Sequence, residues 1–238
     1  KGDLYLGGRA GTQMPPKQLD TLLLAYRQCV FDDANKLRLE TIHSAGASRK
    51  RDLAGIYVEL DTQTPKPKPK PDAERHKDPR TGEGDKPEYV SALEAVIQNR
   101  HVVLHGAPGS GKSTFVQFLS LCLAGEVLYP DQRWHQRLPG WPKEEARLVP
   151  FTIELRRFAK ECPRPLTGKA LSAHLWEYLA QELKANHSDE VVSAARSALE
   201  TGRAVLLLDG LDEIAEPPPA EGEEPAEGRR KQFVRDAI

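Results

Sequence analysis

The stretch that decides the fold is HGAPGSGKST, residues 105–114. It contains three glycines and a proline, and it follows a short apolar run, VVL, at residues 102–104. Glycine is costly to order on folding, so its concentration here needs a structural reason. Residues 106–113 have the spacing G-x-x-x-x-G-K-[ST], which is the full Walker A pattern of phosphate-binding loops.

Each part of this pattern has a physical task. Glycines allow a backbone path in which successive N–H groups point at a chain of phosphates. A helix that begins near Gly111 directs the positive end of its dipole at them. Lys112 supplies a charge to the β- and γ-phosphates, and the Ser113 hydroxyl is a ligand for Mg²⁺. We therefore expect the following residues to contact a nucleotide: Gly106, Ala107, Pro108, Gly109, Ser110, Gly111, Lys112, Ser113 and Thr114.

A second stretch, AVLLLDGLDE at residues 204–213, places acidic residues at the end of an apolar run. A carboxylate at the end of a buried strand is costly unless it holds something. We expect Asp209 to act as a Walker B aspartate that holds Mg²⁺ through water, together with Ser113. Asp212 and Glu213 follow within reach, and one of them could orient or deprotonate an attacking water. The sequence leaves open which of the two does so.

Apolar runs alternate with helical patterns along most of the chain. We predict buried strands at 101–106, around 149–155 and within 203–213. We predict helices at 88–100, 112–127, 167–183 and 189–202. Such alternation implies βαβ units with a parallel sheet covered on both faces. The expected fold class is therefore α/β, a three-layer P-loop NTPase fold with a parallel central sheet, preceded by a small helical segment.

The part before residue 88 divides into two. Residues 19–42 carry a helical apolar pattern, with Arg27 on the polar face, and residues 53–62 read as a short extended piece. Residues 63–87 are rich in proline and charge, which favours a flexible linker, with a Pro-rich ligand for a partner domain as the alternative. The predicted organisation is a helical segment at 1–62, the linker, and a nucleotide-binding domain at 88–238.

Composition limits the compartment and the partners. The net charge of −1 indicates neither nucleic acid nor a membrane as partner, and no apolar run is long enough to span a bilayer. The cysteines Cys29, Cys122 and Cys162 are far apart and form no CxxC pair, which argues against a disulfide framework and a zinc site. We expect a reducing, cytoplasmic setting, with Cys29 and Cys122 as small core residues.

Four stretches together resemble a known family. VVLHGAPGSGKST (102–114) followed by AVLLLDGLDE (204–213) resembles the NACHT domain of the STAND class of P-loop NTPases. In that family a small residue follows the Walker B aspartate, and two acidic residues come shortly after it. LVPFTIELRRFA (148–159) is similar to the family's second strand, and RKRDLAGIYVELDT (49–62) is similar to the segment that precedes NACHT domains in many bacterial members.

The resemblance implies a nucleotide-controlled switch related to NOD-like receptors and bacterial defence proteins. It implies ATP or ADP with Mg²⁺ as cofactors, slow hydrolysis, and self-association when ATP is bound. In such folds the base lies against residues ahead of the first strand, which here are Ile56, Tyr57 and Val58. The sensor arginine and winged-helix domain of a complete member are expected beyond Ile238, while the trigger ligand and the effector are unknown.

Two other functions stay open. The first is a constitutive ATPase, either AAA+-like or dependent on nucleic acid. Gly210 after Asp209 argues against it, because such enzymes usually place glutamate directly after the Walker B aspartate. The second is a non-catalytic scaffold in which the nucleotide only completes the fold.

Overall fold

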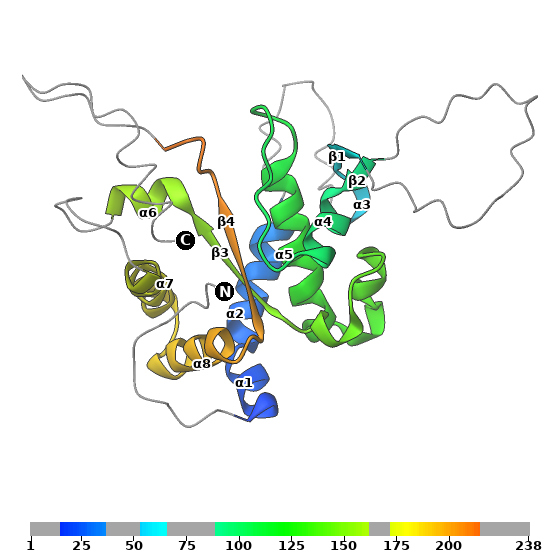
Figure 1. Ribbon diagram of the computed structural model, residues 1–238. Helices are drawn as coiled ribbons and strands as arrows, with labels where there is room; N and C mark the ends of the chain where they lie inside the picture. The colour runs from blue at the N-terminus through cyan, green and yellow to red at the C-terminus, as the bar shows by residue number, and fades with distance from the viewer. Residues whose placement is uncertain (1–14, 37–52, 66–88, 162–171, 215–238) are drawn as a thin grey trace, which may run out of the picture.

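The computed structural model of the chain describes residues 15–36, 53–65, 89–161 and 172–214 (Figure 1). Some of the predictions fall outside these ranges. They concern the end of the first helix, most of the linker, Cys162, the start of the helix predicted at 167–183 and the last part of the nucleotide-binding domain. The described elements, in chain order, are α1 (Pro16–Leu22), α2 (Leu24–Asn35), α3 (Leu53–Ile56), β1 (Asp61–Pro65), β2 (Tyr89–Ser91), α4 (Ala92–Gln98), α5 (Lys112–Leu128), β3 (Val149–Glu154), α6 (Leu155–Glu161), α7 (Ser172–Asn186), α8 (Asp189–Glu200) and β4 (Ala204–Asp209).

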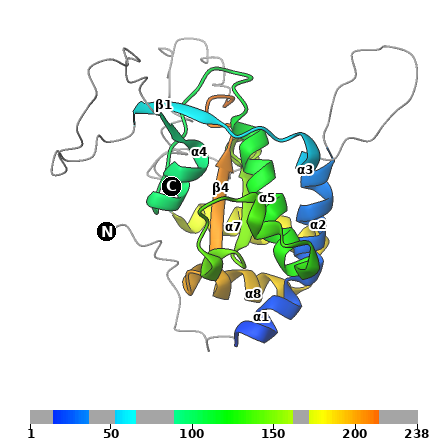
Figure 2. The ribbon, with the colours of Figure 1, turned by 90° about the vertical axis from the view of Figure 1, so that its right-hand side faces the viewer.

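A parallel pair of strands lies at the centre of the molecule. Residues 149–154 of β3 pair in register with residues 204–209 of β4. Successive side chains of a strand point to opposite faces. Leu206 packs in the cluster that contains α7 and α8, whereas its neighbour Leu207 packs in the cluster that contains α5. Helices therefore lie on both sides of the pair (Figures 1 and 2). The parallel pairing and the α/β class were predicted; a wider three-layer sheet stays a prediction.

The first helix differs from the predicted one. The pattern over residues 19–42 predicts one continuous helix, but the structure divides it at Leu23 into α1 and α2. Arg27 was predicted on the polar face, and this is wrong, because its side chain is fully buried. Its guanidinium donates to the carbonyls of Arg147 and Leu148, just before β3. A long side chain with several donors can thus be buried where backbone acceptors lie within its reach.

The segment between α2 and the glycine loop is also more structured than predicted. Residues 53–62 were predicted to be extended, but they begin with the helical turn α3. The first three residues of the predicted linker, 63–87, belong to β1, which pairs with β2 in an antiparallel ladder. The helix predicted over 88–100 begins only after β2. Ser91 and Glu94 form a capping box there, with each side chain accepting from the other residue's backbone N–H.

The strand predicted over residues 101–106 is not formed. No ladder of the described residues includes this stretch, and Val103 is 70% exposed. An apolar run becomes a buried strand only where it pairs with a neighbouring strand edge. Here it runs as an irregular connection from α4 to the glycine loop.

Most of the later predictions are confirmed. Helices α5, α7 and α8 and strands β3 and β4 lie where they were predicted, with small shifts at their ends. Trp134 and Trp141, in the loop between α5 and β3, are buried in the core. Cys122 is buried, and its burial raises the pKa of the thiol to about 12. Cys29 is exposed, so the prediction that it is a core residue is wrong.

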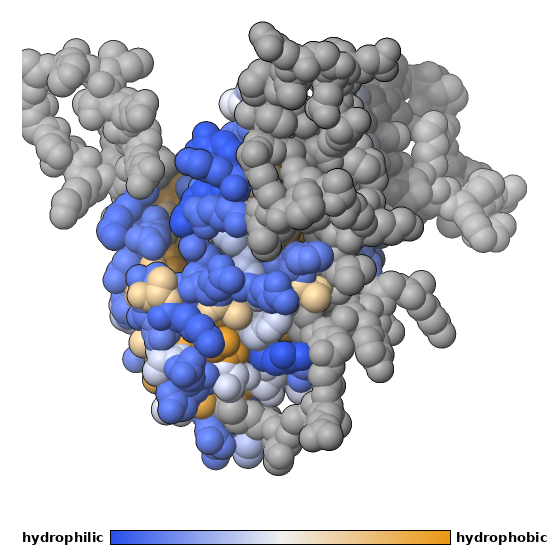
Figure 3. All heavy atoms as spheres, turned by 90° about the vertical axis from the view of Figure 1, so that its left-hand side faces the viewer, coloured by the Kyte–Doolittle hydropathy of each residue, from blue (hydrophilic) through white to orange (hydrophobic). Residues whose placement is uncertain are grey.

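The side of the molecule that carries α6, α7 and α8 presents a mostly hydrophilic surface (Figure 3). Exposed or half-buried ion pairs cover it, among them Arg157–Glu182 and Arg196–Glu200. Among the described residues, no helix is both long enough and apolar enough to cross a membrane.

Candidate functional site

The glycine loop leads directly into the N-terminus of α5. Gly111, the residue before the helix, has φ 92°, a left-handed conformation that suits glycine, and no side chain caps the helix there. A Cβ at Gly106 would lie 2.6 Å from the Oγ of Ser110, so a larger residue there would require this hydroxyl to move. The first N–H groups of the 17-residue helix are therefore free of a side-chain cap and suited to an anion.

The lysine of the motif lies against its own loop. Lys112 Nζ donates to the carbonyl of Gly106 at 2.7 Å and to that of Ala107 at 3.2 Å. It also lies 3.6 Å from the carboxylate of Asp212, and its side chain is only 20% exposed. The ammonium group is thus held between the loop and the turn that follows β4. When a phosphate binds, Lys112 would exchange the two neutral carbonyl acceptors for a charged phosphate oxygen.

The serine of the motif meets the acid at the end of β4. Ser113 Oγ donates to Asp209 Oδ1 at 3.0 Å, although the two residues are 96 positions apart. A hydroxyl and a carboxylate oxygen are ligands that Mg²⁺ accepts, and Mg²⁺ is commonly held by one or two carboxylates together with substrate phosphates. Within the described part of the chain, no group of three His, Cys, Asp or Glu side chains could hold a metal by itself. The residues present fit a metal shared with a nucleotide.

Two further charged residues, which the sequence did not single out, lie at the same edge. Glu154 ends β3 in register with Asp209. Arg156 donates from Nη2 and Nε to one carboxylate oxygen of Glu154, at 2.8 and 3.1 Å. Its Nη1 lies 3.9 Å from Glu213 Oε2. The carboxyl ends of parallel strands meet at one edge of a sheet, so the strand register was the signal that could have found both residues.

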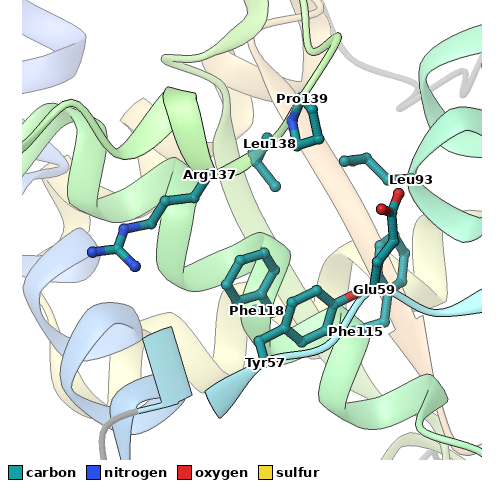
Figure 4. Close-up of a pocket in the computed structure, with 8 residues that line it drawn as sticks. All are labelled: Tyr57, Glu59, Leu93, Phe115, Phe118, Arg137, Leu138 and Pro139. Carbon is teal, nitrogen blue, oxygen red and sulfur yellow. The ribbon is translucent and has the colours of Figure 1, made fainter. Parts of the chain in front are cut away.

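A pocket of about 270 Å³ adjoins the first turns of α5 (Figure 4). The rings of Tyr57 and Phe118 stack at a centroid distance of 3.7 Å with an interplanar angle of 7°. Burial raises the pKa of Tyr57. Leu60 passes beside the glycine loop, since a Cβ at Gly111 would lie 3.6 Å from its Cδ1. The pocket is lined by Tyr57, Glu59, Leu93, Phe115, Phe118, Arg137, Leu138 and Pro139.

The three residues predicted to contact the base differ in their positions. Tyr57 lines the pocket, whereas Val58 does not and is 82% exposed. Ile56 is the last residue of α3, and its side chain lies outside what the structure describes. The structure thus brings the glycine loop, Asp209, Asp212 and Glu213 to one edge of the sheet, while Tyr57 lines a separate pocket beside α5.

Comparison with known proteins agrees with this arrangement. Residues 100–236, more than half of the chain, match the family described as NACHT domain. No curated protein and no solved structure gives a significant match. NACHT domains are P-loop NTPases that bind nucleotides and in general hydrolyse them. The chain belongs to the NACHT family of P-loop NTPases.

Proposed function

We propose that this chain is the nucleotide-binding module of a switch protein in immune or defence signalling. It binds ATP or ADP with Mg²⁺, hydrolyses ATP slowly, and self-associates when ATP is bound. The observation that carries the proposal is the 3.0 Å contact of Ser113 with Asp209, which joins the Walker A and Walker B residues.

The residues at the edge of the sheet divide the chemistry among them. The loop from Gly106 to Thr114 holds the phosphates, and Lys112 neutralises the β- and γ-phosphates. Ser113 and Asp209 hold the metal, which stabilises negative charge on the phosphate oxygens when it is bound. Asp212 or Glu213 orients or deprotonates the attacking water.

We assign the base to the pocket beside α5. Stacked aromatic rings and apolar side chains surround it, and Glu59 adds a negative charge, whereas the guanidinium of Arg137 lies over the ring of Trp134 and points away from the other lining residues (Figure 4). A purine has a flat apolar face and polar edges, which match such a lining. Tyr57 is the residue predicted for the base that lines this pocket.

Switching follows from differential affinity. A ligand shifts an equilibrium only as far as it binds the two states differently. ATP and ADP differ in the γ-phosphate, so the contacts of Lys112, Ser113 and the metal with that group must differ between the resting and the active state. Lys112 is held by loop carbonyls and Asp212 without nucleotide, so binding begins with an exchange of its partners.

Calorimetric titration with Mg²⁺–ATP and Mg²⁺–ADP tests the site. Lys112→Ala is expected to abolish tight binding of both nucleotides, because the phosphates lose their only lysine from the loop. Lys184→Ala is the matched control, since Lys184 makes an exposed ion pair with Asp189 on another face. Wild-type affinity in Lys112→Ala would refute the assignment. Light scattering with each nucleotide then tests self-association, and one molecular mass with both would contradict the switch.

The alternatives give different results in the same preparation. Strong stimulation of turnover by DNA would favour a nucleic-acid-dependent ATPase. Asp212→Asn or Glu213→Gln should prolong ATP retention if these carboxylates act in hydrolysis. Unchanged turnover in both variants would favour a scaffold that needs the nucleotide only for its fold.

A further inference from the structure

Arg156 is a positively charged residue at the carboxyl edge of the sheet. The function proposed above assigns it no role. We propose that Arg156 contacts the γ-phosphate of a bound nucleoside triphosphate. Without nucleotide it is held by Glu154 and Glu213, and it exchanges these partners for the phosphate, so that it distinguishes a triphosphate from a diphosphate. The inference rests on the proposed nucleotide site and adds a residue that distinguishes bound triphosphate from bound diphosphate.

A short series of contacts leads from the motif lysine to Arg156. Lys112 lies 3.6 Å from Asp212, and the next residue, Glu213, lies 3.9 Å from Arg156. Arg156 stands in the first turn of α6, directly after β3, whose last residue pairs with Asp209. Its guanidinium therefore lies at the same edge as the side chains assigned to the metal and the terminal phosphates.

The present partners of Arg156 favour such an exchange. The side chains of Glu154, Glu213 and Arg156 are 43%, 57% and 60% exposed. Ion pairs this open to solvent contribute little to stability, so giving them up costs little. A phosphate has more negative charge than a carboxylate and can accept two parallel hydrogen bonds from the planar guanidinium. The γ-phosphate is the group that only a triphosphate brings to this edge.

The neighbouring arginine provides a matched control. Arg157 differs from Arg156 by one position in the same helix and is similarly exposed, at 49%. It pairs with Glu161 and with Glu182 of α7, whereas Arg156 pairs with Glu154 and with Glu213 of the turn after β4. Removing Arg157 therefore removes the same charge from the same helix without touching the candidate site.

The test compares affinities for a diphosphate and a triphosphate in the full chain. Fluorescent N-methylanthraniloyl-ADP and a non-hydrolysable ATP analogue are titrated with Mg²⁺ into the wild type, Arg156→Ala, Arg156→Lys and Arg157→Ala. We expect Arg156→Ala to lower the affinity for the triphosphate about tenfold and to leave that for ADP unchanged. Arg156→Lys should recover part of the loss, because a lysine keeps the charge without the fork. Arg157→Ala should match the wild type.

Glu154→Gln tests the exchange itself. It loosens Arg156 in the nucleotide-free chain and removes one negative charge from the edge, so it should raise the affinity for the triphosphate more when Arg156 is present than in the Arg156→Ala background, where only the repulsion is relieved. An equal gain in both backgrounds would overturn the exchange. An unchanged triphosphate affinity in Arg156→Ala, or an equal loss for both nucleotides, would overturn the γ-phosphate contact.

Failure of the underlying site has a different signature. If Lys112→Ala binds both nucleotides like the wild type, the phosphate assignment is wrong whatever Arg156 does. A wild-type chain that binds neither nucleotide would overturn both proposals. Circular dichroism of each variant checks folding, which should be unaffected because Arg156 is exposed.

Discussion

Replacing Arg27 tests how the N-terminal helices are held against the nucleotide-binding fold. The side chain is fully buried. Nη1 donates to the carbonyl of Leu148 at 3.1 Å, and Nη2 donates to the carbonyl of Arg147 at 2.9 Å and to Asp20 at 3.3 Å. Burial lowers the pKa of Arg27 to about 10, which leaves the group charged at neutral pH. Helix α2 is thereby tied to the chain just before β3.

The structure sets the size of the effect for Arg27→Met, which keeps most of the volume and removes the donors. Two part-buried backbone carbonyls lose their donor, and an acceptor left without one costs about 1–3 kcal/mol, toward the lower end where water can reach it. Asp20 also loses its contact with Arg27, but it keeps Arg147 at 3.0 Å and Arg203 at 3.6 Å as partners, so this loss adds little to the cost. We therefore expect the free energy of unfolding to fall by about 3 kcal/mol.

Urea unfolding followed by circular dichroism measures this change. With a slope of about 2 kcal/mol per molar, the midpoint should fall by about 1.5 M. Arg147→Met is the control, because its side chain is 53% exposed and its ion pair with Asp20 should contribute less than about 1 kcal/mol. A midpoint shift below about 0.3 M for Arg27→Met, with an unchanged slope, would refute the reasoning. Equal midpoint shifts in the two variants would show that the burial of Arg27 does not determine its contribution to stability.

Three further changes have defined outcomes. Gly125→Ala places a Cβ 2.7 Å from the ring of Trp134, so overpacking should cost about 1–3 kcal/mol in thermal unfolding; a variant as stable as the wild type would contradict this packing. Because burial raises the pKa of Cys122 to about 12, a disulfide reagent at pH 8 should label exposed Cys29 in the folded chain and Cys122 only after unfolding. Mass spectrometry distinguishes the two, and equal labelling rates would be inconsistent with the burial. Ser113→Ala should weaken nucleotide binding about tenfold with Mg²⁺ and little in EDTA; an equal loss in both would show that the hydroxyl does not serve the metal.

The sequence predicted best what local chemistry determines. The glycine loop and the start of α5 follow from backbone requirements at a few positions, such as the left-handed Gly111. The strand β4 is an apolar run that ends in Asp209 and β3 is mostly apolar, and their parallel pairing follows from the helices between them. The meeting of Ser113 with Asp209 then needs only the rule that ligands gather at the carboxyl edge of such a sheet.

What the sequence did not predict depends on contacts between distant segments. Polar residues are expected at the surface, so Arg27 was placed there; its burial requires the carbonyls of residues 147 and 148, some 120 positions away. Val103 looks like part of a buried strand, but apolar character does not supply a strand edge to pair with. The stacking of Tyr57 on Phe118 depends on where α3 lies beside α5, which no local pattern encodes.

The charges at the carboxyl edge explain why nucleotide and metal are expected to bind together. Two cations among the described residues, Lys112 and Arg156, face four carboxylates, an excess of two negative charges. The carboxylates are Glu154, Asp209, Asp212 and Glu213. A nucleotide adds further negative charge, so it meets repulsion that a divalent cation would offset. The longer phosphate chain brings more charge to this edge. Chelating Mg²⁺ should therefore weaken the binding of ATP more than that of ADP, and an equal effect on both would mean that the γ-phosphate does not reach these carboxylates.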